Sequence, residues 1–168
     1  KASQASDRNA VVADWQKAIA LAPYQGVYYL NLANNYMALA NEEAAGAKDL
    51  IKIQNYLSLA IDNGKKGADL SQYNANVNES LALIYENASF YVRGSLEWAE
   101  SLYKKVGELD PNNPASYFRL ALVNMAKANI ETDADEKKFF INEAVKRYDE
   151  ALAKKPDFIA ALYGQAVA

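Results

Sequence analysis

Apolar and polar positions along this chain follow two recurring patterns. The first pattern is a small residue, a bulky residue four positions later, a small residue three further, and then proline. It occurs three times: Val11, Trp15, Ala18 and Pro23; Ala99, Tyr103, Val106 and Pro111; Ala144, Tyr148, Ala151 and Pro156. This spacing places the side chains on one face of a helix that proline ends. A fourth copy is Ile53, Leu57 and Ala60, where Gly64 is expected to end the helix.

The second pattern is a stripe with a leucine and a small residue side by side at its centre. Three segments carry it: Tyr29, Leu32, Ala33 and Tyr36; Asn78, Leu81, Ala82 and Tyr85; Tyr117, Leu120, Ala121 and Asn124. Spacings of three, four and seven residues are typical of one face of an amphipathic helix. The small residue lets a neighbouring helix approach closely. Helices of this type, called first helices below, alternate with the proline-ended second helices, which predicts an all-α stack of helix pairs.

The patterns and local signals predict about eight helices. Their expected ranges are 7–22, 25–40, 41–63, 75–90, 93–109, 114–130, 135–154 and 157–168. We expect Asn41, followed by Glu42 and Glu43, to cap a helix, and Asp133 with Glu136 to form a capping box. The stretch 66–74 is expected to be the long loop between repeats.

Composition limits the kinds of chemistry that the chain can perform. It has 168 residues, no cysteine, no histidine and a net charge of −3. The commonest acid, base, nucleophile and metal ligand are therefore missing, and we expect no enzyme, no cofactor and no metal. Dispersed lysine and arginine argue against nucleic acid as a partner, and no apolar run is long enough to insert into a membrane.

The two patterns together resemble the tetratricopeptide repeat, a 34-residue helix-turn-helix unit. The resemblance implies a right-handed α-solenoid of antiparallel helix pairs, here with lengthened hairpins. It divides a single domain of residues 1–168 into a half repeat 7–23, repeats 24–65, 75–111 and 112–156, and a half repeat 157–168. The chain then looks like a fragment of a longer protein, and its last helix, with Leu162, Tyr163, Ala166 and Val167, is expected to be covered by more chain or by another copy.

The resemblance also implies a non-catalytic scaffold that binds a peptide or protein segment on the concave face of the first helices. The matching positions are Leu30, Asn31, Asn34, Met37, Glu79, Ser80, Leu83, Glu86, Phe118, Arg119, Leu122, Met125 and Tyr163. They predict an apolar floor with a central anchor at Phe118, and a ligand with basic residues and apolar anchors. A chaperone-tail clamp is not expected, because only Asn34 and Arg119 match that set.

Two alternatives stay open. The same positions could be solvated surface or could contact another part of a longer parent protein. A second, less specific resemblance, in segments 110–114 and 117–121, is to the repeat tails of bacterial O-antigen polymerases and ligases. It implies a structural or oligomerisation tail of a membrane-attached glycan enzyme. The domain itself is expected to be soluble, either in the cytoplasm or on the extracytoplasmic side of a bacterial membrane.

Overall fold

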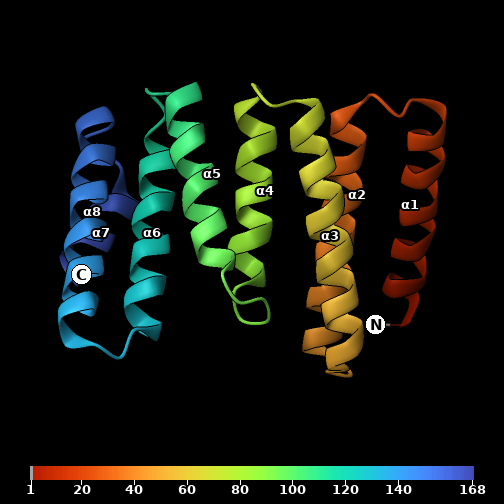
Figure 1. The fold of residues 1–168 in the computed structure, drawn as a ribbon, viewed down its shortest axis with the longest axis horizontal. Coiled ribbons are helices and arrows are strands. Elements are labelled where there is room, and N and C mark those ends of the chain that lie inside the picture. The colour runs from red at the N-terminus through yellow and green to blue at the C-terminus, as the bar shows by residue number, and fades with distance from the viewer. Residues whose placement is uncertain (1) are drawn as a thin grey trace. The chain divides into compact units, whose positions relative to one another are not determined.

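The computed structural model describes residues 2–168 and the side chains of residues 7–168. These residues form eight α-helices and no strand (Figure 1). The helices are α1 (Ala2–Leu21), α2 (Gly26–Ala45), α3 (Leu50–Leu70), α4 (Ala75–Ala88), α5 (Ser95–Leu109), α6 (Pro114–Ile130), α7 (Ala134–Lys154) and α8 (Ile159–Val167). The predicted all-α fold built from repeated helix pairs is confirmed.

The described chain divides into two compact units. Unit 1 is Lys1–Arg93, and its main helix pair is α2 with α3, flanked by α1 and α4. Unit 2 is Gly94–Ala168, and its main pair is α6 with α7, flanked by α5 and α8. The division falls inside the predicted repeat 75–111, between its two helices. The single domain of residues 1–168 and its repeat boundaries therefore stay a prediction.

Small residues lie where first and second helices meet. In unit 1, the alanines of the two stripes, Ala33 on α2 and Ala60 on α3, are fully buried. In unit 2, one core cluster joins α6, α7 and α8 and consists of Ala121, Ala144, Tyr148, Ala151 and Ala161. The bulky member of the second-helix pattern fills the space that the small residues leave, since Tyr148 is only 2 % exposed. The two stripes predicted from the sequence are thus the contact surfaces of the helix pairs.

The predicted start and end of α3 are both wrong. Asn41 does not begin a helix, because α2 continues to Ala45, and the residue that caps α3 is Asp49. The Asp49 carboxylate accepts hydrogen bonds from the backbone N–H groups of Ile51 and Lys52. Gly64 does not end α3 either, since the helix runs on to Leu70 through most of the expected loop 66–74.

The reason for the second error is that the glycines of α3 serve packing. Gly67 and Gly26 face each other, so that a Cβ atom built on Gly67 would lie 2.9 Å from the Gly26 carbonyl oxygen. A Cβ atom on Gly64 would lie 2.8 Å from a Leu81 methyl group of α4. Glycine at these positions allows α3 to approach its neighbours closely. Each glycine inside the helix lowers stability by roughly 0.5–1 kcal/mol relative to alanine.

The cap predicted at the start of α7 is confirmed, but the predicted return hydrogen bond from the Asp133 N–H group to Glu136 is not. The Asp133 carboxylate accepts hydrogen bonds from the N–H groups of Asp135 and Glu136. The carboxylate that accepts from the Asp133 N–H group belongs to Glu131, at 3.0 Å, and not to Glu136.

We predict that Gly67→Ala and Gly107→Ala change stability in opposite directions. Gly67→Ala forces a methyl group against the α2 backbone and should lower the free energy of unfolding by about 1–3 kcal/mol. On Gly107 of α5, the nearest atom to a new Cβ is the Ser116 hydroxyl at 3.8 Å. Gly107→Ala should therefore raise the free energy of unfolding by about 0.5–1 kcal/mol through helix propensity. Urea unfolding of both variants provides the comparison, and equal effects would contradict the close contact of α2 and α3.

Candidate binding faces on the first helices

The predicted binding residues on α2 differ in accessibility. Leu30 and Met37 are buried, with 8 % and 6 % of their surface exposed, whereas Asn31 is half-buried and Asn34 is exposed. The cause is that α2 contacts three helices, α1, α3 and α4, and buries a wide apolar face. Leu30 and Met37 belong to this face and have little surface left for a ligand.

The accessible stripe of α2 lies one position away from the buried one. It consists of Val27, Asn31, Asn34 and Ala38, which are exposed or half-buried and are spaced by four, three and four residues. The sequence analysis included Asn31 and Asn34 but missed Val27 and Ala38. The signal that could have found them is the second apolar stripe through Leu30 and Met37, which indicates a helix with more than two neighbours.

The neighbouring first helix, α4, contributes a polar and acidic face to unit 1. Its predicted residues Glu79, Leu83 and Glu86 are all half-buried. Two polar side chains beside them bond to their own helix: the Ser80 hydroxyl donates to the Asn76 carbonyl at 2.9 Å, and the Asn87 amide donates to the Leu83 carbonyl at 2.8 Å. Because α2 contacts α4, unit 1 brings the amides of α2 and the carboxylates of α4 together on adjacent first helices.

On α6 of unit 2, the predicted residues are Phe118, Arg119, Leu122 and Met125, and all four are half-buried. Phe118 and Met125 pack against the core cluster of this unit. The Phe118 ring centroid lies 6.0 Å from that of Tyr148 on α7 and 5.2 Å from that of Phe158, just before α8. Phe118 therefore fastens α6 to α7 and α8, and part of its surface is used within the fold.

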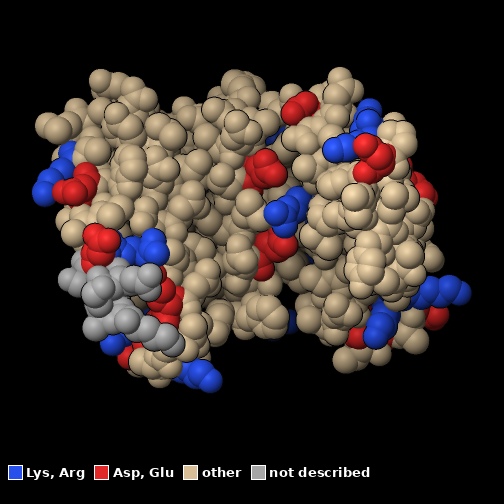
Figure 2. All heavy atoms as spheres, turned by 180° about the vertical axis from the view of Figure 1, so that it is seen from behind, with Lys and Arg blue, Asp and Glu red and all other residues tan. Residues whose placement is uncertain are grey.

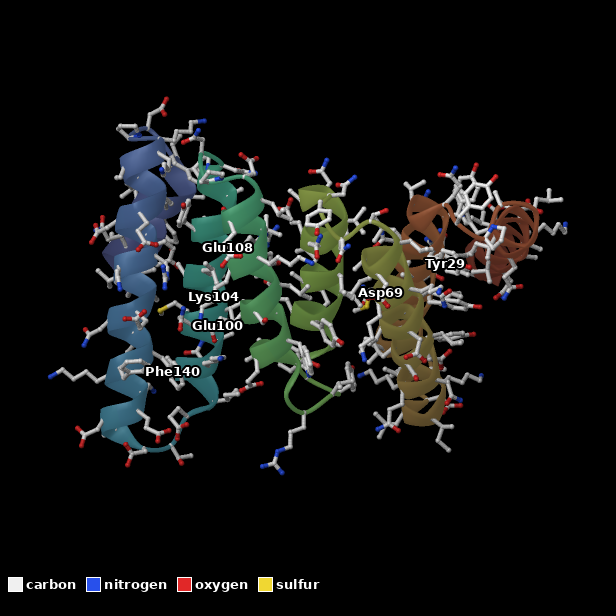
Figure 3. The ribbon with its side chains drawn as sticks, turned by 45° about the horizontal axis from the view of Figure 1, so that its top comes forward. Tyr29, Asp69, Glu100, Lys104, Glu108 and Phe140 are labelled. Atoms are coloured by element: carbon white, nitrogen blue, oxygen red, sulfur yellow. The ribbon has the colours of Figure 1, made fainter. Side chains whose placement is uncertain are left out.

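The closest group of charged side chains in unit 2 joins α5 to α6. Glu100 accepts hydrogen bonds from Lys104 at 2.6 Å and from Lys127 at 2.5 Å. Lys127 is buried, and its ammonium group also lies 5.7 Å from the ring centroid of Phe140 on α7. Figure 3 shows Glu100, Lys104 and Glu108 along α5 with Phe140 on the neighbouring α7. This cluster ties three helices together, and its geometry is that of a structural ion pair.

Burial raises the pKa of Glu100, but the hydrogen bonds and charges of Lys104 and Lys127 outweigh burial and hold this pKa below its ordinary value. The carboxylate is therefore the form that the fold stabilises.

The remaining charged residues are of both signs, in a chain with 18 lysines and arginines and 21 aspartates and glutamates. Figure 2 shows one face of the molecule on which most side chains are uncharged and the acidic and basic groups are scattered. Among the described residues, no group of three or more carboxylates is placed to hold a metal ion. None of the described helices combines the length and the apolar character needed to cross a membrane.

We predict that the stabilising effect of Glu100 depends on pH. Because its pKa is lowered in the folded state, its contribution is present above the unfolded-state pKa of about 4.3 and disappears as pH falls through the folded-state value. Glu100→Gln should lower the free energy of unfolding at pH 7 by about 1–2 kcal/mol, and the difference should shrink in strong acid. Urea unfolding across this pH range tests it, with exposed Glu108→Gln on the same helix as the control. A difference that grows in acid would refute the assignment.

We also predict that Phe118→Ala weakens the fold. Removal of the half-buried ring should lower the free energy of unfolding by about 2 kcal/mol, less than for a fully buried phenylalanine. The matched control is Tyr163→Ala, because Tyr163 occupies the equivalent position on α8 and is 70 % exposed. Thermal unfolding compares them, and equal stabilities would show that Phe118 contributes little within unit 2.

Comparisons with known proteins concern structure alone. No protein-family model matches the chain, and no curated protein matches its sequence. Among solved structures, a thermophilic TPR protein of Thermus thermophilus, TTC0263, is similar with a TM-score of 0.71 and 20 % identity, over 96 % of this chain and 73 % of that one. The first TPR of Spaghetti (RPAP3), bound to HSP90 peptide SRMEEVD, has a TM-score of 0.52 and 20 % identity over 80 % and 88 % of the two chains.

A third similar structure is YrrB, described as a TPR protein with an unusual peptide-binding site. Its TM-score is 0.52, with 19 % identity over 98 % of this chain and 86 % of that one. None of these three structures is described as the tail of a membrane polymerase or ligase, so the resemblance to such tails stays a prediction. The predicted resemblance is confirmed at the level of architecture, and the chain has the tetratricopeptide-repeat fold.

Proposed function

We propose that this chain is a non-catalytic scaffold that binds a peptide or protein segment on the accessible faces of its first helices. The observation that carries the proposal is the surface of α2 and α4 in unit 1. Asparagine, serine and glutamate side chains remain accessible there, while the apolar residues of the same helices are mostly buried. These amides and carboxylates can exchange hydrogen bonds with water for hydrogen bonds with a ligand.

The chemistry of this face suits a basic or neutral segment. Each asparagine carboxamide offers two donors and an acceptor, which match the C=O and N–H groups of a peptide backbone. Glu79 and Glu86 favour lysine or arginine in the ligand, and Leu83 offers an apolar contact between them.

Two of the similar structures support binding as the general role. One is bound to an HSP90 peptide, and the other is described by its peptide-binding site. The acidic peptide SRMEEVD is a poor guide to the ligand of this chain, because Glu79 and Glu86 would repel its carboxylates. The buried positions of Leu30 and Met37 also favour contacts through Asn31 and Asn34 over an apolar floor on α2.

A random peptide library panned against the chain tests this proposal. We expect the selected peptides to share basic residues, and their affinity to fall about tenfold for Asn34→Ala and for Glu79→Lys, as measured by titration calorimetry. Because Glu79 contributes through its charge, the affinity of the selected peptides should fall as the salt concentration rises.

The matched controls are Gln54→Ala and Asp62→Lys on α3, where both side chains are exposed on a second helix. They repeat the amide deletion and the charge reversal away from the proposed face, and their affinities should stay unchanged. Equal losses for the α3 and first-helix variants, or the selection of unrelated peptides, would remove the site from α2 and α4.

A further inference from the structure

The accessible face of α4 continues past the last residue of the helix. Ser89, which follows Ala88, keeps helical backbone angles, with φ −59° and ψ −26°. The Tyr91 and Val92 N–H groups both donate to the Ala88 carbonyl at 2.9 Å. The bond from Val92 spans four residues, as in an α-helix, so the segment after Ala88 forms one more turn of helical type.

This added turn places Phe90 on the proposed binding face of unit 1. Phe90 lies four residues after Glu86, seven after Leu83 and eleven after Glu79. Residues with these spacings share one face of a helix, and residues four apart have Cβ atoms about 5–6 Å from each other. Phe90 therefore extends the stripe of Glu79, Leu83 and Glu86 by one residue, which the sequence analysis missed.

The Phe90 ring is open to a ligand on both faces. Of the large apolar side chains that the structure describes, Phe90 has the largest exposed fraction, 94 %. Leu83, the other apolar residue of the stripe, is half-buried. No cavity surrounds a ring with this exposure, so it suits a cation better than an apolar group. A cation is attracted by the ring quadrupole itself and does not need to be enclosed.

The charges near Phe90 in the chain also favour a cation. Glu79 and Glu86 lie on the same stripe, and residues 75–92 contain no lysine or arginine. The carboxyl end of α4 adds the partial negative charge of its helix dipole. Arg93, three residues after Phe90, is exposed, so the cation of a ligand is expected on the side of the ring that faces Glu86.

We propose that Phe90 binds a lysine or arginine side chain of the ligand, with the cation over the ring and beside Glu86. This inference rests on the proposed function and names the residue that recognises the basic group of the ligand. The aliphatic part of a lysine or arginine packs on apolar surface while its charged end stays in water, which an exposed ring beside a carboxylate permits. An exposed contact of this kind changes affinity by about two- to fivefold.

Substitutions that separate an aromatic face from apolar bulk test this contact. The probe is the peptide that binds most tightly in the library selection, and titration calorimetry measures its affinity. Phe90→Leu keeps an apolar side chain without a ring and should lower the affinity about two- to fivefold. Phe90→Trp should raise it, because tryptophan attracts cations most strongly. Phe139→Leu is the matched control, since Phe139 is 59 % exposed on α7 of unit 2, and it should leave the affinity unchanged.

Neutral versions of the same peptide identify the group that the ring binds. Each lysine is replaced in turn by norleucine and each arginine by citrulline, which keep the approximate size of the side chain and remove its charge. One of these replacements should abolish the difference in affinity between the wild-type chain and Phe90→Leu. A difference that persists for every neutral peptide would show an apolar contact and would overturn the proposal, as would equal losses for Phe90→Leu and Phe139→Leu.

The result also separates this inference from the proposed function. If Asn34→Ala and Glu79→Lys weaken binding and Phe90→Leu does not, the binding face on α2 and α4 stands and the role of Phe90 is wrong. If the library yields no peptide that binds, the proposed function fails, and the inference fails with it.

Discussion

The close approach of first and second helices is the constraint on which the rest of this structure depends. Where the helices meet, Ala33, Ala60 and Ala121 are fully buried, and a larger side chain there would overpack the contact. At Gly26 and Gly67 not even a methyl group fits. Close contact lets the remaining apolar side chains interdigitate at the density of a protein interior, which supplies most of the stability of the pairs.

The number of neighbours that each first helix has decides which of its side chains a ligand can contact. Helix α2 packs against three helices and buries two apolar stripes, including Leu30 and Met37, so that Asn31 and Asn34 share its accessible stripe only with Val27 and Ala38. Within the part of the chain that the structure describes, helix α8 packs extensively against α7 alone and leaves a stripe of apolar side chains exposed. Equivalent positions in the repeat pattern thus have different surroundings, and the pattern alone does not determine their accessibility.

This dependence explains which parts of the structure could be predicted from the sequence. The stripes were predictable because helical spacing and residue size are local properties, and they indicated the fold class and the helix pairs. The cap at Asp133 was predictable from a separate local signal, an aspartate directly before the first turn of α7. The end of α3 was not predictable, because glycine ends a helix in one context and permits close packing in another, as at Gly64 and Gly67. The accessibility of Phe118 was not predictable either, since it depends on Tyr148 of α7 and on Phe158, which lies just before α8.

The polarity of each accessible face determines which kind of contact it suits. A ligand that exchanges must leave a surface that water can solvate, and the amides and carboxylates of α2 and α4 satisfy this requirement in the free state. An apolar stripe such as that of α8 gains free energy mainly by being covered, and it can be covered well only by a surface of matching shape without charge. On α1, half-buried Trp15 stands at the position that Leu57 occupies on α3 and Tyr148 on α7, so the stripe that packs the helix pairs has a bulky apolar or aromatic residue on each of these second helices. The packing of each helix pair therefore determines which chemistry stays accessible on its surface.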